Sequence, residues 1–174
     1  MGMQERILEM SPSNQTDAEL DLISLEVIRN RLTVIADEME VTLLRSSFSA
    51  IMKEALDGSA AIFDGSGNTI AQASAIPIHL GSLINAVRKV VELFSHDMAE
   101  GDIFILNDPY QGGTHLPDIN IICPVFYEGR RIAFTASIAH KQDIGGKTPG
   151  STPPDATEIF AEGLIVLAPR DEVL

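Results

Sequence analysis

Two apolar runs on either side of a short turn constrain the fold of this chain more than any other feature. Residues 119–127 and 131–137 each have the length of a strand, and the turn at residues 128–130 contains a glycine. The two runs therefore predict an antiparallel hairpin. Its returning strand brings His140 back towards the segment that holds His115, although the two histidines are far apart in the sequence.

A long helical pattern precedes the hairpin. Apolar residues recur at steps of three and four over residues 25–39, and a second apolar line follows at intervals of seven over residues 27–48. We expect one helix from a cap within residues 16–24, with Asp21 among the candidates, to about Lys53. Two apolar lines predict a helix covered on two sides. A coiled coil is the alternative, but three valines at one register and the lack of a clear flanking charge pattern disfavour it.

Shorter patterns complete the expected fold. Two strands at 58–64 and 68–73 flank a glycine-rich turn, and a third is expected at 103–106. A second helix is expected over residues 82–94, capped by Ser82. In the hairpin, Pro124 cannot donate to a sheet ladder, which predicts a bulge or a sheet edge there. Together these patterns predict an α+β domain, with a long N-terminal helix and a second helix packed on an antiparallel or mixed sheet.

The acidic composition limits the partners of the chain. Asp and Glu number 25 against 12 Lys and Arg, and the formal net charge of -13 argues against binding nucleic-acid phosphates or anionic lipid. The single cysteine, Cys123, excludes an internal disulfide and suits a reducing cytoplasm. No stretch approaches the ~18 apolar residues of a membrane span, and no secretory signal begins the chain. We expect a cytoplasmic domain over residues 17–174, preceded by a flexible leader at residues 1–16.

The strongest chemical signal lies in two glycine-rich connections beside the hairpin. His115 and Asp118 are three residues apart, and the hairpin returns His140 to them. Two imidazoles and a carboxylate form a mixed nitrogen and oxygen site that suits Zn, Mn or non-haem Fe(II). We therefore predict that His115, Asp118 and His140 bind a divalent metal and leave open positions for substrate or water. Fe(II) oxygenases usually space the first histidine and the carboxylate by two, so that class is a minor alternative.

Three more residues, Asp108, Asp143 and His79, are predicted to act catalytically beside the metal. Asp143 follows a histidine by three residues, as Asp118 does, and is expected to orient a histidine or hold a water. His79 is expected to face the same cleft. Asp108 lies in an Asn-Asp-Pro-Tyr stretch, where simple turn chemistry is the alternative. The two Gly-Gly pairs lack Walker spacing, and no Gly-x-Ser-x-Gly elbow supports a serine nucleophile.

Several of these residues stand in longer blocks that resemble a known family. The blocks are residues 25–32, 63–64 with 70–72, 77–81, 107–118 and 143–146. In them the chain resembles the hydantoinase B/oxoprolinase family, which includes N-methylhydantoinase B subunits, 5-oxoprolinases and the large subunits of acetone and acetophenone carboxylases. The resemblance covers roughly residues 20–165, and the block from Asn-Asp-Pro-Tyr to His-Leu-Pro-Asp is long and specific.

The resemblance implies an ATP-dependent enzyme built from several parts. A separate hydantoinase A-type subunit or domain binds ATP and Mg and phosphorylates the substrate, and the B-type part supplies a metal site where a hydantoin or 5-oxoproline-like ring is opened. In the carboxylase branch, which carboxylates a small ketone, the ligand pattern His-x-x-Asp then His falls on His115, Asp118 and His140. Ring opening is the main hypothesis, and ketone carboxylation is its rival.

The chain also departs from the family pattern. Leu22 follows Asp21 where the family usually has proline, Ala60 stands where many members have cysteine, and Lys141 replaces a common second histidine. Family subunits run to several hundred residues, so the chain resembles only their N-terminal part, as expected of a truncated or split gene. A non-catalytic assembly module or remnant is therefore an alternative of another class. The two apolar lines of the long helix also predict association into an oligomer.

Overall fold

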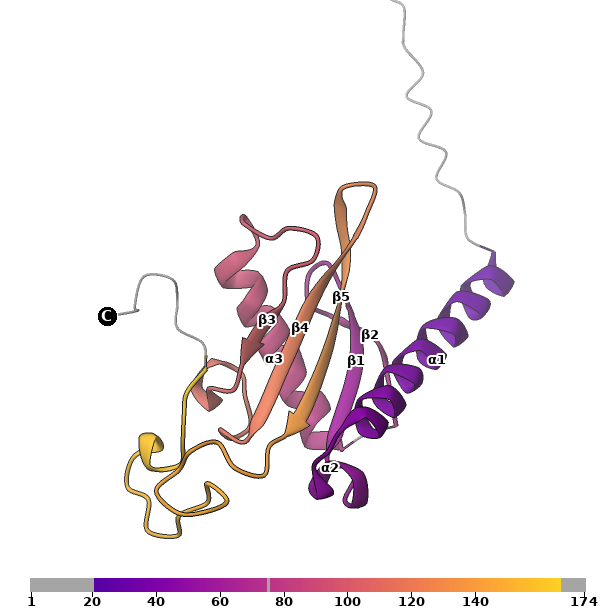
Figure 1. Cartoon of the computed structure of the whole chain (residues 1–174). Coiled ribbons are helices and arrows are strands. Elements are labelled where there is room, and N and C mark those ends of the chain that lie inside the picture. Colours follow the sequence, from indigo (N-terminus) through magenta and orange to yellow (C-terminus); the bar gives the residue numbers. More distant parts are fainter. Residues whose placement is uncertain (1–20, 75, 167–174) are drawn as a thin grey trace, which may run out of the picture.

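The structure, a computed structural model, describes residues 21–74 and 76–166, so the expected leader at residues 1–16 lies outside the described residues. Its centre is a five-stranded sheet with the strand order β2-β1-β5-β4-β3 (Figure 1). The strands are β1 (Gly58–Asp64), β2 (Thr69–Gln72), β3 (Phe104–Leu106), β4 (Asp118–Tyr127) and β5 (Arg130–His140). Every strand expected from the sequence is present, and the sheet is antiparallel throughout.

The β4–β5 hairpin is the longest pairing in the sheet and extends beyond the predicted bounds. β4 begins at Asp118 and β5 ends at His140, and these two residues are paired across the hairpin. The register shifts after Val125, directly beyond Pro124, and β3 pairs with β4 only as far as Ile122. The expectation of a bulge or an edge near Pro124 is therefore confirmed, because within residues 21–74 and 76–166 β5 alone pairs with β4 there.

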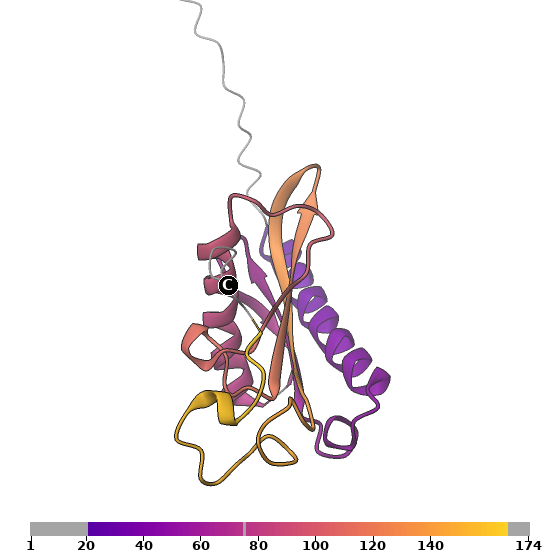
Figure 2. The ribbon, with the colours of Figure 1, turned by 60° about the vertical axis from the view of Figure 1, so that its left-hand side comes forward.

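Two helices cover opposite faces of the sheet, which confirms the α+β class. On one face, α3 (Pro77–Phe94) packs against the core that contains Phe63. On the other face, α1 (Leu22–Ser46) packs its Ala36 near Ile62. Phe63 and Ile62 are neighbours in β1 and so point to opposite faces. Figure 2 shows the sheet between the two helices. Neither helix, nor any other within residues 21–74 and 76–166, is long and apolar enough to cross a membrane.

α1 starts where one of the expected caps lies but ends early. Its N-cap is Asp21, and the expected continuation to Lys53 is wrong, because the helix stops and a short second helix, α2 (Ala50–Glu54), follows. Within the break, the hydroxyl of Ser47 accepts the backbone N–H of Ser49 at 3.1 Å. Serine bonds of this kind compete with the helical backbone and favour a break.

Only one of the two apolar lines on α1 is covered, and only in part, because its members Leu25, Ile28 and Ile35 are exposed. Leu32 and Met39 pack against the sheet around the fully buried Ala36. The second line is exposed; its members are Val27, Val34, Val41 and Phe48. A cover on two sides, as expected from the sequence, is thus not provided by the part of the chain that the structure describes.

α3 starts earlier than expected, and this moves His79 out of a loop and into a helix. The helix begins at Pro77, a residue favoured in the first turn because an N–H there would have no helical partner. The expected start at Ser82 is wrong, since Ser82 lies inside the helix and its hydroxyl donates to the carbonyl of His79 at 2.9 Å. Leu83, Ala86, Val87 and Val90 are buried on the face of the helix that packs against the sheet. His79 therefore lies in the first turn of α3, buried against the sheet.

Two loops meet at the end of the sheet where β4 starts and β5 ends. Asn107, in the loop before β4, joins them: its side-chain amide donates to the carbonyl oxygens of Leu116 at 2.7 Å and Leu164 at 2.9 Å. Its amide oxygen accepts the backbone N–H of Val166 at 2.7 Å. The described loop after β5, residues 141–166, contains no strand and one short 3-10 turn.

Candidate metal centre

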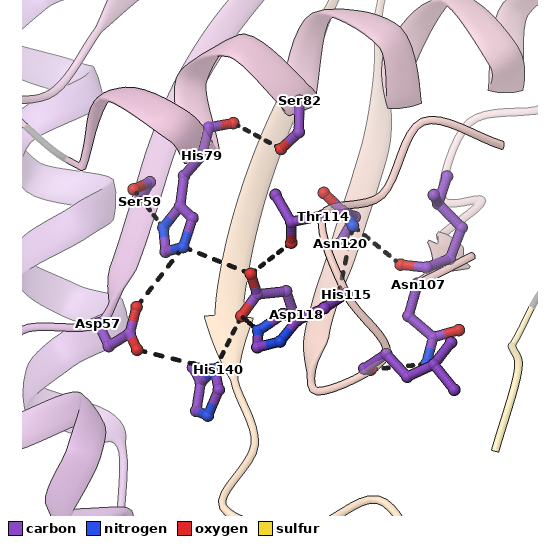
Figure 3. Close-up of polar contacts among 12 residues, drawn as sticks. Asp57, Ser59, His79, Ser82, Asn107, Thr114, His115, Asp118, Asn120 and His140 are labelled. Atoms are coloured by element: carbon purple, nitrogen blue, oxygen red, sulfur yellow. Dashed lines mark hydrogen bonds and ion pairs between the residues drawn. The ribbon is translucent and has the colours of Figure 1, made fainter. Parts of the chain in front are cut away.

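Three histidines surround one carboxylate at the end of the sheet, next to the first turn of α3 (Figure 3). Asp118 opens β4, His140 closes β5, His115 comes from the loop before β4, and His79 comes from α3. Because β4 and β5 are antiparallel, the start of one lies beside the end of the other, and the register pairs Asp118 with His140. The structure thus brings the three predicted ligands together, with His79 beside them.

Asp118 is the centre of the cluster and uses its two oxygens differently. Oδ1 lies 3.0 Å from Nε2 of His115 and 2.9 Å from Nδ1 of His140. Oδ2 accepts the hydroxyl of Thr114 and lies 3.4 Å from Nε2 of His79. The residue is only 2% exposed. One carboxylate oxygen therefore faces the two other predicted ligands, while the opposite oxygen is held from behind.

The surroundings of Asp118 keep it ionised. Burial on its own would raise the pKa of Asp118, but hydrogen bonds from His115, His79 and Thr114 outweigh burial and hold the pKa far below its usual range. Metal ligands of the carboxylate type act in the deprotonated form. The folded chain therefore presents Asp118 in the state that a cation requires.

His79 is buried between a hydroxyl and two carboxylates, so it is placed to orient its neighbours. Its Nδ1 lies 3.0 Å from Oγ of Ser59, and its Nε2 lies 3.4 Å from Asp118 and 3.5 Å from Asp57. Carboxylates only accept hydrogen bonds, so the imidazole that fits has its proton on Nε2 and receives the Ser59 hydroxyl at Nδ1. His79 thereby supports Asp118 from the side away from His115. Its predicted catalytic role stays a prediction.

Asp57 belongs to the cluster and was not predicted from the sequence. Its Oδ2 lies 3.7 Å from Nδ1 of His140, and its Oδ1 lies 3.5 Å from Nε2 of His79. Its backbone carbonyl accepts the N–H of His140 at 3.2 Å. Asp57 directly precedes β1, which pairs with β5 so that Gly58 stands opposite Ala139. That pairing places Asp57 next to His140, and no local pattern in the sequence specifies it.

The donor atoms of the three predicted ligands are close enough to share one cation. Single donor atoms of His115, Asp118 and His140 all lie within 4.8 Å of one another. The two imidazole rings are 5.1 Å apart and tilted by 35°. A carboxylate and two imidazoles suit Zn, Mn or Fe(II), so the residues fit the predicted metal. The side chain of His115 is 41% exposed, which gives the cluster an open side.

The pKa of His115, one of the three predicted ligands, is shifted by its neighbours in the cluster. Its hydrogen bond to Asp118 raises the pKa of His115 above the ordinary value of 6.5, against the opposing effect of burial. Metals bind the neutral imidazole, so a raised pKa makes protons stronger competitors for His115.

Asp108 and Asp143 organise loops rather than the histidine cluster. Asp108 accepts the backbone N–H of Tyr110 at 2.9 Å and caps a short 3-10 turn. Asp143 accepts the backbone N–H groups of Gly145 at 2.7 Å and Gly150 at 2.8 Å, and the hydroxyl of Ser151 at 3.1 Å. Within residues 76–166, neither carboxylate forms an ion pair with a histidine. Their predicted catalytic roles stay predictions.

The family comparison agrees with the blocks seen in the sequence. A model of the hydantoinase B/oxoprolinase family matches residues 21–170. This chain belongs to the hydantoinase B/oxoprolinase family. The matched range contains every residue of the cluster, so this hydantoinase B-type chain carries its histidines and carboxylates within the family's own domain.

Relatives of this hydantoinase B-type chain are much longer than the chain itself. The 5-oxoprolinase of Dictyostelium discoideum is 41% identical over 167 residues, which are 96% of this chain and 13% of that protein. The caprolactamase subunit beta of Pseudomonas jessenii is 43% identical over 145 residues, which are 83% of this chain and 25% of that protein. The chain thus spans a quarter or less of the length of these two relatives.

Two solved structures share the fold. The crystal structure of the ATP-dependent caprolactamase from Pseudomonas jessenii superposes with a TM-score of 0.79 at 42% identity, covering 86% of this chain and 26% of that chain. A nucleotide-free acetone carboxylase superposes with a TM-score of 0.77 at 24% identity, covering 83% of this chain and 19% of that chain. The fold of the hydantoinase B-type chain is therefore the one found in part of both enzymes.

Proposed function

We propose that this chain is the metal-binding part of a hydantoinase B-type enzyme that opens the ring of a cyclic amide. The observation that carries the proposal is the buried Asp118 carboxylate, held between His115 and His140 at one end of the sheet. The relatives named 5-oxoprolinase and caprolactamase subunit beta support a ring amide as the substrate. The substrates, partners and activity of the whole enzyme are proposed for this chain on that basis.

In this proposal some residues of the cluster bind the metal, and others hold the metal ligands in place. His115, Asp118 and His140 would bind the metal, which as a Lewis acid polarises an amide carbonyl and lowers the pKa of a water. His79 and Thr114 fix the second oxygen of Asp118, so that its first oxygen keeps its direction.

Asp57 stands beside the proposed ligands as a further carboxylate. Its side chain is 24% exposed, and it lies 3.7 Å from Nδ1 of His140. A partly exposed carboxylate at this place is suited to take up a proton from a water that enters the cluster.

ATP and Mg belong to a partner in this proposal. The chain contains no phosphate loop with Walker spacing. The similar caprolactamase is described as ATP-dependent, and one of its chains as subunit beta. We infer a hydantoinase A-type subunit as the partner that binds ATP and activates the substrate. Ketone carboxylation is the rival activity, and its relative at 24% identity supports the fold alone.

Elemental analysis by inductively coupled plasma mass spectrometry tests the proposed site. Wild type, His115→Ala and His96→Ala are purified side by side; His96 is exposed near the end of α3 and serves as the matched control. We expect near-stoichiometric Zn, Mn or Fe in the wild type and in His96→Ala, and loss of the metal from His115→Ala. Absence of metal from all three after reloading would refute the proposal and favour the assembly module or remnant.

Activity assays then separate the two reactions. The metal-loaded chain is combined with an A-type subunit, and ATP-linked ring opening is measured beside bicarbonate-dependent consumption of a ketone. Ring opening that is lost in His115→Ala supports the proposed function, whereas ketone consumption alone would overturn it.

A further inference from the structure

A cavity of about 380 Å³ adjoins the metal cluster where α1 ends and α2 begins. α2 lies beside the end of β5 (Figure 1), and His140, the last residue of β5, forms part of the cavity wall. His140 therefore belongs to both the cluster and the cavity. A molecule in the cavity would lie against one of the proposed metal ligands.

Hydroxyl groups gather on the helix side of this cavity. Residues 46–49, at the break between α1 and α2, read Ser-Ser-Phe-Ser, and all three serines line the cavity. The hydroxyl oxygen of Ser47 accepts the backbone N–H of Ser49, which leaves the proton of the Ser47 hydroxyl available to donate. The hydroxyl of Ser49 is buried and has no hydrogen-bond partner among the described residues. Buried polar groups are almost always paired, so the unpaired Ser49 hydroxyl points to a ligand in the cavity.

The charge at the cavity is positive, although the chain as a whole has a formal net charge of -13. Lys141 lines the cavity, and Lys53 lies beside it, with Nζ 5.8 Å from the centre of the ring of Phe48, another lining residue. Within residues 21–74 and 76–166 neither lysine forms a salt bridge. The carboxylates of the cluster approach His140 at Nδ1, and none of the described carboxylates lines the cavity. Ammonium groups beside serine hydroxyls are donors that suit an anion.

A phosphate group matches these donors better than a carboxylate does. A phosphate monoester has three strongly accepting oxygens and a charge of about -1.5 to -2 at pH 7. It can therefore accept from Lys141 and from the hydroxyls of Ser47 and Ser49 at the same time. A carboxylate offers two oxygens and one charge, so it would leave one of these donors without a partner.

The rest of the cavity wall is apolar and suits a small organic group. Leu43, Met52 and Ala139 line it beside Phe48, which is 99% exposed. An exposed aromatic ring next to a phosphate site offers apolar surface to an organic group on the same molecule. Pockets for small molecules range from about 300 to 1,000 Å³, and this cavity lies at the lower end, as expected for a single small ring that carries a phosphate.

We infer that this cavity binds the phosphorylated form of the substrate, with its phosphate group on Lys141 and the serine hydroxyls and its organic ring on Phe48. The inference rests on the proposed function, in which the A-type partner activates the substrate by phosphorylation. It adds a place on this chain where the phosphorylated substrate is held against His140.

Titration of the full 174-residue chain with two phosphates tests the inference. Phenyl phosphate carries a ring and a phosphate group, and inorganic phosphate carries the phosphate alone. The ¹⁵N-labelled chain is stripped of metal and dialysed, and amide shifts of residues 46–53 and 139–141 are followed by NMR. We expect both ligands to shift both segments, and phenyl phosphate to bind at least about fivefold more tightly than inorganic phosphate. Binding should weaken as sodium chloride is added, because salt screens the exposed ammonium groups.

Variants of the lining residues assign the phosphate contacts. Lys141→Gln removes the charge and should weaken phenyl phosphate binding at least about tenfold, whereas Lys141→Arg keeps the charge and should stay within about threefold of the wild type. Ser49→Ala removes the unpaired hydroxyl and should weaken binding several-fold. Lys89→Gln is the matched control, because Lys89 lies on α3, on the other face of the sheet, and its loss should leave the affinity unchanged.

The outcomes separate this inference from the proposed function. No binding of phenyl phosphate, shifts confined to other segments, or equal affinities of the wild type and Lys141→Gln would overturn the inference. Equal binding of the two phosphates would identify released inorganic phosphate as the ligand and overturn the assignment to the phosphorylated substrate. A chain that holds metal but binds neither phosphate would refute the inference alone. A chain that binds phenyl phosphate but retains no metal would refute the proposed metal site alone, since the titration requires no metal.

Discussion

Replacing Asn107 with alanine tests how the two loops around the site are held together. The Asn107 side chain is fully buried and bonds to three backbone groups: the carbonyls of Leu116 and Leu164 and the N–H of Val166. The first of these groups lies in the loop before β4, and the other two lie in the loop after β5. Alanine cannot replace any of the three bonds.

The size of the effect follows from the burial of each bond. The carbonyl of the fully buried Leu116 would remain without a partner, which costs ~1–3 kcal/mol. The bonds to Leu164 and Val166 are partly buried, so water can replace the lost partner and each costs only ~0.5–1.5 kcal/mol. We therefore expect the free energy of unfolding to fall by about 2–6 kcal/mol in Asn107→Ala.

Urea unfolding followed by circular dichroism measures this change, with Asn85→Ala as the control. Asn85 is an exposed asparagine on α3, and its replacement should change the free energy of unfolding by less than about 0.5 kcal/mol. Hydrogen exchange gives a local reading, since the amide of Val166 should lose its protection. An Asn107→Ala variant as stable as the control, with Val166 still protected, would refute the reasoning.

Three further predictions concern the site and its loops. Ser59→Ala removes the hydroxyl beside Nδ1 of His79. Because Ser59 acts on the proposed ligand Asp118 only through His79, we expect metal binding to weaken by no more than about tenfold. The ¹⁵N shifts of the His79 ring report its tautomer, and unchanged shifts and affinity would contradict the positioning role. Gly112 has a φ of +108°, and an added Cβ would lie 2.7 Å from the backbone nitrogen of Ala86. Gly112→Ala should therefore lower the free energy of unfolding, measured in urea, by more than ~1 kcal/mol. An unchanged midpoint of urea unfolding would contradict this. Backbone hydrogen bonds, and to a lesser degree the hydroxyl of Ser151, lower the pKa of Asp143 in the folded chain. The stabilisation that Asp143 gives the loop is therefore fully present above its ordinary pKa of 3.8 and is lost as the pH falls through its lower pKa in the folded chain. Hydrogen exchange of the loop amides, corrected for intrinsic rates, should therefore rise in acid in the wild type and be fast at every pH in Asp143→Asn.

The hairpin explains why the three predicted ligands could be found from the sequence. Once residues 119–137 are read as two strands with a tight turn, antiparallel pairing leaves one end where Asp118 and His140 can meet, and His115 is three residues away. Periodicity and turn chemistry are local signals, and here they are enough to define a long-range contact. The family resemblance pointed to the same three residues.

The positions of Asp57 and His79 in the cluster could not be predicted from local sequence patterns. Asp57 reaches the site only because β1 pairs with β5, and no alternation within one strand specifies its neighbour in the sheet. The position of His79 depends on where α3 starts. Pro77 and Ser82 both obey the rules for a helix start, and the buried contact between His79 and Ser59 accompanies the earlier one. Packing that involves distant residues, rather than the local pattern, decided both.

The apolar lines of α1 illustrate a further limit. The sequence shows that two sides of the helix are apolar, but it cannot show which part of a protein covers each side. The sheet covers one side, around Ala36, and the other side, from Val27 to Phe48, is exposed in the described residues.

The position of the β4–β5 turn has a consequence for how this site can change over time. Glu128 and Gly129, both with positive φ, form the turn at one end of the hairpin, and the proposed ligands Asp118 and His140 stand at the other. Residues can be added to the turn, or a label or domain attached there, without altering the pairing that brings the ligands together. A single residue inserted within either strand would instead shift the register and send one ligand to the opposite face of the sheet. The tip of the hairpin is thus open to variation, while the lengths of its two arms are not.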